Sequence, residues 1–144
     1  MKRRLSEKNA AARLIRAGLD ATSHRVRVLM AAANTESPRS APEILTAVGG
    51  SGEINRVTVY RILDLLVERR ILNRLDLGEK SQRFCLRDQE STPEHAHLHC
   101  IHCDRYLCLA ALPVDRAALD GLDLAVKHVD IRLEGVCPEC RPEK

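Results

Sequence analysis

The N-terminal half of the chain repeats apolar residues at the spacing of amphipathic helices. An Arg/Lys-rich start leads into a predicted helix that ends near Ala17, because Gly18 is typical of the position just after a helix C-terminus. Thr22 is the predicted N-cap of a second helix, in which apolar residues recur at i, i+3, i+4 and i+7. This apolar stripe consists of Val26, Leu29, Met30 and Ala33.

Ser40 and Glu43 have the spacing of a capping box, which predicts a short third helix through about Val48. A glycine-rich turn at 49–52 separates it from a longer predicted helix over 55–68, whose apolar face comprises Val59, Ile62, Leu63, Leu66 and Val67. This succession is typical of a helix-turn-helix, in which the first residues of the second helix meet base edges and phosphates. We therefore predict that DNA is contacted by Arg56, Thr58, Tyr60 and Arg61. The alternative is that these residues form the solvated face of a buried helix.

Two segments after this helix, 70–75 and 82–86, alternate apolar and polar residues as strands do. A turn between them would make a hairpin, so the segment 70–86 is a predicted wing. Further along, the pattern predicts a short helix at 114–120 and a strand at 124–133.

Charge is divided unevenly along the chain. Residues 1–74 hold 14 Lys+Arg and 7 Asp+Glu, net +7, and residues 75–144 hold 9 and 13, net −4, which together give the +3 of the whole chain. A basic half suits a polyanion, which favours a nucleic-acid-binding domain followed by a domain with another task. The alternative is a solvated basic surface. No apolar run approaches the roughly 18 residues that a membrane span needs, so no membrane partner is expected.

Cys100-x-x-Cys103 and Cys137-x-x-Cys140 are two thiol pairs separated by 33 residues. Doubled CxxC spacing is typical of one tetrahedral Zn²⁺ site closed by four thiolates. Two disulfides fit less well, because no secretory leader opens the chain and the cysteines suggest a reducing cytoplasm. With 2 Tyr, 1 Phe and no Trp, the core is thin, and a metal would help to stabilise it. We expect a cytoplasmic protein with a structural zinc, and a pair of redox dithiols remains the alternative.

Five motifs follow one another along residues 14–140: Gly18-Leu-x-x-Thr22-x-x-Arg25, Ser40-Ala-x-Glu43, Val57-Thr-Val-Tyr-Arg61-x-Leu63-x-x-Leu66, His95-x-His97-x-x-Cys100-x-x-Cys103 and Cys137-x-x-Cys140. In this order they resemble the Fur (ferric uptake regulator) family. The resemblance implies an α+β fold with an N-terminal winged helix-turn-helix domain at 1–87 and a hinge at 88–94. A small α/β dimerisation domain would follow at 95–144, with the four cysteines as its structural zinc site.

The resemblance also implies a second, regulatory metal at the junction of the two domains. Carried over by motif, its histidine pair falls on His95 and His97, its wing-strand ligand on Cys85, and an acidic ligand on Cys108, here a thiol instead of a carboxylate. Two thiolates and two imidazoles make a soft site, which suits Zn²⁺ better than Fe²⁺ or Mn²⁺. Within the family, this ligand set is most similar to that of the zinc uptake regulators.

Other positions depart from the family pattern or stay open. Pro38 stands where iron sensors have a histidine just before the third helix, and it cannot bind metal. His99 and His102, beside the zinc cysteines, are open between outer groups, spare ligands and solvated residues. Asn73 stands near the position where zinc sensors often have Asp or His, so a ligand there is missing or supplied by Cys108, and His128, one residue off the family's C-terminal histidine ligand, is not assigned.

The sequence therefore predicts a zinc-responsive, homodimeric transcriptional repressor that binds double-stranded operator DNA and controls zinc uptake genes, with two Zn²⁺ per chain. No small-molecule substrate is expected. An iron- or peroxide-responsive regulator of the same family is one alternative, and a structural zinc-ribbon scaffold is another. An enzyme is not expected, because a zinc nucleobase deaminase pairs H-x-E with P-C-x-x-C, whereas His95-Ala-His97 lacks the glutamate and Val136 replaces the proline.

Overall fold

The computed structural model describes residues 4–35, 37–49, 54–75, 82–87, 95–113, 116–126 and 131–142. The chain forms two compact units, the N-terminal unit Met1–Arg87 and the C-terminal unit Asp88–Lys144. The expected hinge at 88–94, the turn of the wing and most of the glycine-rich turn lie outside the described residues. No helix in the described part of the chain is long and apolar enough to cross a membrane.

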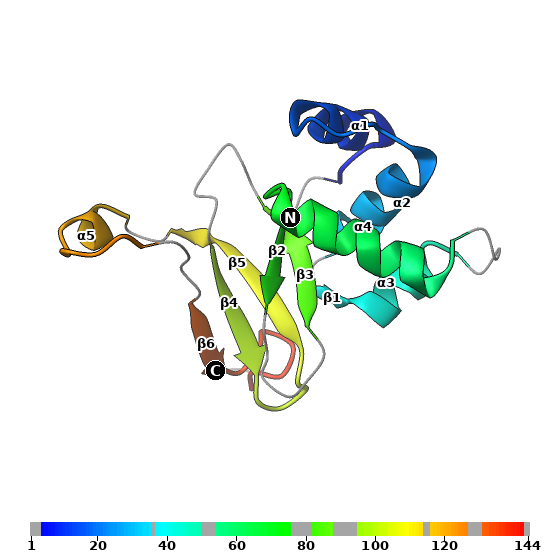
Figure 1. Ribbon diagram of the computed structural model, residues 1–144. Coiled ribbons are helices and arrows are strands. Elements are labelled where there is room, and N and C mark those ends of the chain that lie inside the picture. The colour runs from blue at the N-terminus through cyan, green and yellow to red at the C-terminus, as the bar shows by residue number, and fades with distance from the viewer. Residues whose placement is uncertain are drawn as a thin grey trace. The chain divides into compact units, whose positions relative to one another are not determined.

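Helices dominate the N-terminal unit (Figure 1), and each begins at a side chain that caps it. The helices of its described residues are α1 (Glu7–Arg16), α2 (Ser23–Ala33), α3 (Ala41–Ala47) and α4 (Arg56–Glu68). Their N-caps accept hydrogen bonds from backbone N–H groups three residues later, and these caps are Ser6, Thr22, Ser40 and Asn55. The predicted caps at Thr22 and Ser40 are confirmed, and Gly18 follows α1 with a φ of +81°, which glycine adopts without a steric penalty.

A small antiparallel sheet completes the N-terminal unit. It contains β1 (Arg39–Ser40), β2 (Leu72–Leu75) and β3 (Arg83–Leu86) in the order β1-β3-β2. The predicted pairing of the two wing strands is confirmed, with Asn73 opposite Cys85. Successive strand residues face opposite sides, so Cys85 points away from the core that Phe84 enters.

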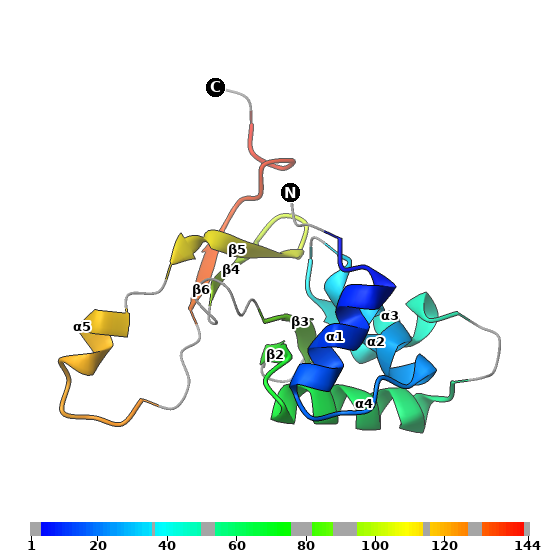
Figure 2. The same ribbon diagram turned by 90° about the horizontal axis from the view of Figure 1, so that it is seen from above.

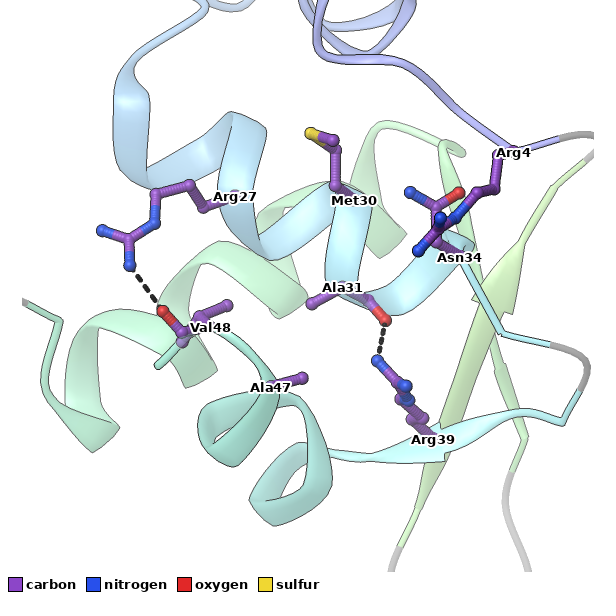
Figure 3. Close-up of a pocket in the computed structure, with 8 residues that line it drawn as sticks. All are labelled: Arg4, Arg27, Met30, Ala31, Asn34, Arg39, Ala47 and Val48. Carbon is purple, nitrogen blue, oxygen red and sulfur yellow. Dashed lines mark hydrogen bonds between the residues drawn. The ribbon is translucent and has the colours of Figure 1, made fainter. Parts of the chain in front are cut away.

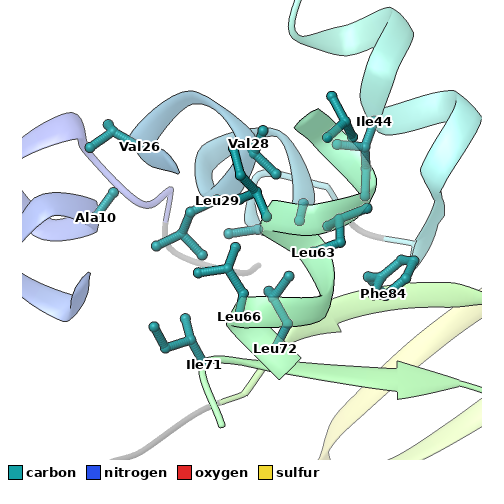
Figure 4. Packing of buried hydrophobic residues seen from close by; sticks show 14 of the residues in the cluster. Ala10, Val26, Val28, Leu29, Ile44, Leu63, Leu66, Ile71, Leu72 and Phe84 are labelled. Carbon is teal, nitrogen blue, oxygen red and sulfur yellow. The ribbon is translucent and has the colours of Figure 1, made fainter. Parts of the chain in front are cut away.

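One apolar cluster runs through the N-terminal unit and is contributed by all four helices and the sheet (Figure 4). Leu14, Leu29, Leu63 and Leu66 are at most 1% exposed, so each lies at the centre of this packing. The predicted stripe of α2 is buried except for Met30, which is half-buried, and Val28 beside it is fully buried as well. Figure 2 shows α4 along the outer side of the unit, with its buried face turned toward the other helices.

The C-terminal unit contains a second sheet and a short helix. Its elements are β4 (His95–Cys100), β5 (Tyr106–Pro113), α5 (Arg116–Asp120) and β6 (Arg132–Gly135), and the strand order is β5-β4-β6. β4 pairs antiparallel with β5 and parallel with β6. Residues 127–130 of the expected strand at 124–133 lie outside the described residues. Of its described part, 124–126 and Ile131 are not strand, and Leu124 is 70% exposed, so the prediction is wrong at its start, whereas β6 contains its last two residues.

The predicted fold class is confirmed. Two packed helices, α3 and α4, are followed by an antiparallel strand pair, which is the arrangement of a winged helix-turn-helix. A separate, smaller unit of mixed strands and helix carries the cysteine pairs.

Candidate functional site

The four cysteines of the two CxxC motifs meet at one end of the second sheet. Cys100 is the last residue of β4, and Cys137 follows β6, the parallel neighbour of β4, so the register brings both motifs to the same edge. The sulfur atoms of Cys100, Cys103, Cys137 and Cys140 all lie within 4.8 Å of one another. Residues far apart in sequence therefore form one compact cluster of thiols.

The spacing of these sulfur atoms fits a zinc ion. A tetrahedral Zn²⁺ with Zn–S bonds of about 2.3 Å separates its sulfur ligands by about 3.8 Å, and the sulfur atoms of Cys103 and Cys137 are 3.8 Å apart. Tight turns shape the cluster: the Asp104 N–H donates to the Cys100 carbonyl at 2.8 Å, and the Arg141 N–H donates to the Cys137 carbonyl at 2.9 Å. A bound Zn²⁺ would crosslink the ends of β4 and β6.

Hydrogen bonds shift the pKa values of Cys100, Cys137 and Cys140 in different directions. The backbone N–H of Cys103, with those of Cys137 and His102, lowers the pKa of Cys100 from 9.0 to about 5. The Arg105 guanidinium, 3.7 Å from the sulfur atom of Cys137, lowers the pKa of that thiol. The pKa of Cys140 rises to about 12, chiefly through its hydrogen bond to Cys137. Two thiols are thus prepared as metal ligands, whereas Cys140 ionises readily only with a cation present.

Sequence reasoning missed Arg105. Its guanidinium contacts Cys137 and forms an ion pair with Glu139 at 2.7 Å. The hydrogen bond to Cys137 in turn raises the pKa of Arg105. Nothing in the sequence distinguishes it from other lone arginines, because its partner lies 32 residues away.

The proposed regulatory ligands are divided between the two units. His97 on β4 lies directly opposite Cys108 on β5, and their ligand atoms are within 4.8 Å of each other. Directly opposed residues of an antiparallel pair share one face of the sheet, so both side chains can approach the same cation. His95 is the first residue of β4, where the register shifts before Ala96. Cys85 lies on β3 of the N-terminal unit.

The remaining candidate ligands have other surroundings. His99 lies 2.5 Å from an Asp104 carboxylate oxygen and stacks on Tyr106 with ring centroids 4.6 Å apart. His102 is exposed in the turn that carries Cys103, and Asn73 lies opposite Cys85 on β2. His128 lies outside the described residues.

The N-terminal turn of α4 presents cationic and polar groups. The Asn55 side chain accepts a hydrogen bond from the Thr58 N–H at 2.9 Å, which fixes the start of the helix. Arg56 and Arg61 are exposed, and the Arg56 guanidinium lies over the Tyr60 ring, 5.3 Å from its centroid. Thr58 and Tyr60 are half-buried at the flanks. The turn can therefore offer guanidinium, hydroxyl and backbone donors to a polyanion.

A second basic feature of the N-terminal unit is an open hollow around α2 and α3 (Figure 3). Arg27 donates to the Val48 carbonyl just after α3, and Arg39 donates to the Ala31 carbonyl near the end of α2 at 2.8 Å. These carbonyls belong to helix ends, where intrahelical donors are missing. Both arginines therefore hold helix ends together as well as adding positive charge.

A winged helix with a cationic leading turn, joined to a unit with a four-thiol metal site, defines a metal-responsive transcription regulator. The model of the ferric uptake regulator family matches residues 16–133. The chain is 37% identical to the ferric uptake regulation protein of Bacillus subtilis (strain 168) over 124 residues, which are 80% of this chain and 78% of that protein. The chain therefore belongs to the ferric uptake regulator family.

The chain is also similar to proteins that are named for responses to peroxide and to zinc. A peroxide-responsive repressor PerR of Staphylococcus epidermidis is 27% identical over 136 residues, covering 92% of this chain and 88% of that protein. A solved structure of a zinc uptake regulator complexed with zinc and DNA superimposes with a TM-score of 0.69 at 20% identity, covering 93% of this chain and 91% of that chain. At that identity the superposition shows the fold alone.

Proposed function

We propose that this regulator responds to zinc and represses zinc uptake genes by binding operator DNA when its second metal site holds Zn²⁺. The observation that carries the proposal is the pairing of His97 with Cys108 across β4 and β5. An imidazole and a thiolate on one sheet face favour Zn²⁺, because Fe²⁺ and Mn²⁺ are commonly bound by harder oxygen ligands.

Cys85 and His95 complete the proposed regulatory site. Their assignment rests on the resemblance to the family, and Cys85 adds a second thiolate from the wing strand β3. Because this ligand would come from the N-terminal unit and the others from the C-terminal unit, metal occupancy is coupled to the placement of α4. The cysteines at 100, 103, 137 and 140 form the separate structural site, which brings the expected content to about two Zn²⁺ per chain.

The proposed DNA contacts are made by a homodimer. Arg56, Thr58, Tyr60 and Arg61 of each protomer enter a major groove, and half-sites lie roughly one helical turn apart or a multiple of it. Association with a second copy rests on the resemblance to the family, and three exposed leucines of the C-terminal unit could contribute apolar contacts to it. These are Leu122, Leu124 and Leu133, which are 49%, 70% and 41% exposed. Metal that strengthens DNA binding must in turn be held more tightly by the DNA-bound protein.

Buffered metal titrations test the proposal directly. The full-length protein is titrated with free Zn²⁺ or Fe²⁺ while its affinity for a duplex selected from a randomised library is followed by fluorescence anisotropy. Zn²⁺ should drive binding. Cys85→Ala and His97→Ala should remove the zinc response and lower the zinc content from about two to about one per chain. His102→Ala is the matched control, because this exposed histidine lies in the same unit.

Each alternative gives a different result. An iron- or peroxide-responsive regulator is favoured by the names of the similar proteins from B. subtilis and S. epidermidis, and it would bind DNA with Fe²⁺ at concentrations where Zn²⁺ has no effect. A structural zinc-ribbon scaffold would hold about one zinc per chain and show no metal-dependent DNA binding. A zinc response that is retained in both Cys85→Ala and His97→Ala would mean that the regulatory site lies elsewhere.

A further inference from the structure

Val57 is an apolar side chain left in solvent at the first turn of α4. Its side chain is 57% exposed, whereas Val59, two residues later, is fully buried. Residues four apart on a helix lie on the same face, so Val57 and Arg61 are neighbours on the exposed side of α4. A branched apolar group therefore lies among the cationic and polar groups that begin the helix.

Exposure alone does not make Val57 unusual, because single apolar residues are common on protein surfaces. Ile15 on α1 is 64% exposed in the same unit. The surroundings of Val57 are what distinguish it. Arg56 precedes it, Arg61 lies one turn further, and Asp64 on the same face forms an ion pair with Arg74. Within the described part of the chain, Arg56 and Arg61 have no acidic partner, so the leading end of this face combines an apolar group with positive charge.

The major groove of DNA offers one apolar group on its base edges, the C5 methyl of thymine. We propose that Val57 is a specificity-determining residue that packs against a thymine methyl of the operator. This inference rests on the proposed function, since it requires α4 to enter the major groove. Val57 and Arg61 are about one helical turn apart, roughly 5.4 Å, and stacked bases rise about 3.4 Å per step. Val57 and Arg61 are therefore close enough to contact neighbouring positions of one half-site.

Removing single thymine methyls tests the contact. The full-length, zinc-loaded protein first selects a duplex from a randomised library, and each thymine of that duplex is then replaced by deoxyuridine. Wild-type protein should lose roughly fourfold in affinity at one thymine per half-site, as expected for one methyl group returned to water. Val57→Ala should lose a similar factor on the unmodified duplex and then be insensitive to that replacement. Val57→Thr, which keeps one methyl group, should remain sensitive, and Ile15→Ala should behave as wild type.

The outcomes separate the inference from the proposed function. If the wild-type protein selects no duplex in the presence of zinc, the proposed function fails and the inference falls with it. If it selects a duplex but Val57→Ala shows the same pattern of thymine sensitivity as wild type, only the inference is overturned. The inference is supported if Val57→Ala is the only variant that becomes insensitive to the replacement of one thymine. An equal salt dependence for both proteins should accompany that result, since Val57 makes no phosphate contact.

Discussion

The N-terminal and C-terminal units are stabilised in different ways. The N-terminal unit buries a continuous apolar cluster that extends from Leu5 to Phe84. Among the described residues of the C-terminal unit, the buried ones are few, and most carry chemistry: Ala96, His97, Cys100, Tyr106 and Cys137. Apolar burial can stabilise the first unit without help. The described part of the second unit buries few apolar side chains, so we expect its stability to depend on the metal that its thiols can hold.

Loss of one structural thiolate should have the largest effect. Cys137→Ser should unfold the C-terminal unit, because a structural zinc site contributes on the order of 10 kcal/mol to folding. Zinc analysis and sedimentation should show loss of the structural zinc and a monomer, while the helices of the N-terminal unit persist in circular dichroism. Cys108→Ser is the matched control and should keep a folded C-terminal unit. A zinc-loaded dimer from Cys137→Ser would contradict the structural assignment.

Acid should release the same metal. The pKa of Cys100 is lowered from 9.0 to about 5 in the folded chain, so its contribution to stability is complete above pH 9.0 and disappears as the pH falls through about 5. Protons compete with zinc for this thiolate, so zinc release to a chromogenic chelator should increase as the pH falls. Because Arg105 lowers the pKa of Cys137, Arg105→Ala should release zinc at a higher pH than wild type. Arg132→Ala is the control and should release zinc at the wild-type pH, because no contact between Arg132 and Cys137 is found among the described residues. An unchanged release pH in Arg105→Ala would exclude this role of Arg105.

A cavity in the apolar cluster should weaken the N-terminal unit alone. Leu63 is 1% exposed in the centre of the cluster, and Leu63→Ala should lower the free energy of unfolding by about 2–5 kcal/mol. The loss in the free energy of unfolding, measured by urea denaturation, should be the same with and without a chelator. Ile15→Ala, at an exposed position, should change stability little. A loss that depends on metal would show that the two units do not fold independently.

Truncation of Arg61, the arginine proposed to contact DNA, should have the smallest effect. Arg61→Ala should cost about 1–3 kcal/mol of DNA binding, concentrated at one operator position, if Arg61 contacts a base. A phosphate contact would instead weaken all sequences alike and reduce the salt slope by about one unit. Arg69→Ala at the other end of α4 is the control. Operator binding that equals wild type at every salt concentration would remove α4 from the DNA interface.

The helical unit was predicted well from sequence because its signals are local. Thr22 and Ser40 cap helices within three residues, and the apolar period of α4 fits its observed buried face. In the C-terminal unit, the segments of β4 and β5 were interpreted only as ligand motifs and not predicted as strands. The strand observed as β6 was expected at 124–133. Its pairing with β4 is a contact between distant segments, which the local pattern does not encode.

The candidate site was likewise predicted where its signals are local and missed where they are not. The CxxC spacing predicted a four-thiol cluster, because both ligands of each pair are close in sequence. The contact of Arg105 with Cys137 and the position of His97 opposite Cys108 depend on strand register, which only the folded sheet defines.

Hydrogen exchange of the full-length chain, with metal and after its removal by a chelator, tests the difference between the units most directly. Removal should expose the amides of β4, β5 and β6 to rapid exchange, while the amides of α2 and α4 keep their protection. Protection that is lost in both units together, or retained in both, would contradict the account that metal stabilises the C-terminal unit and apolar packing stabilises the N-terminal unit.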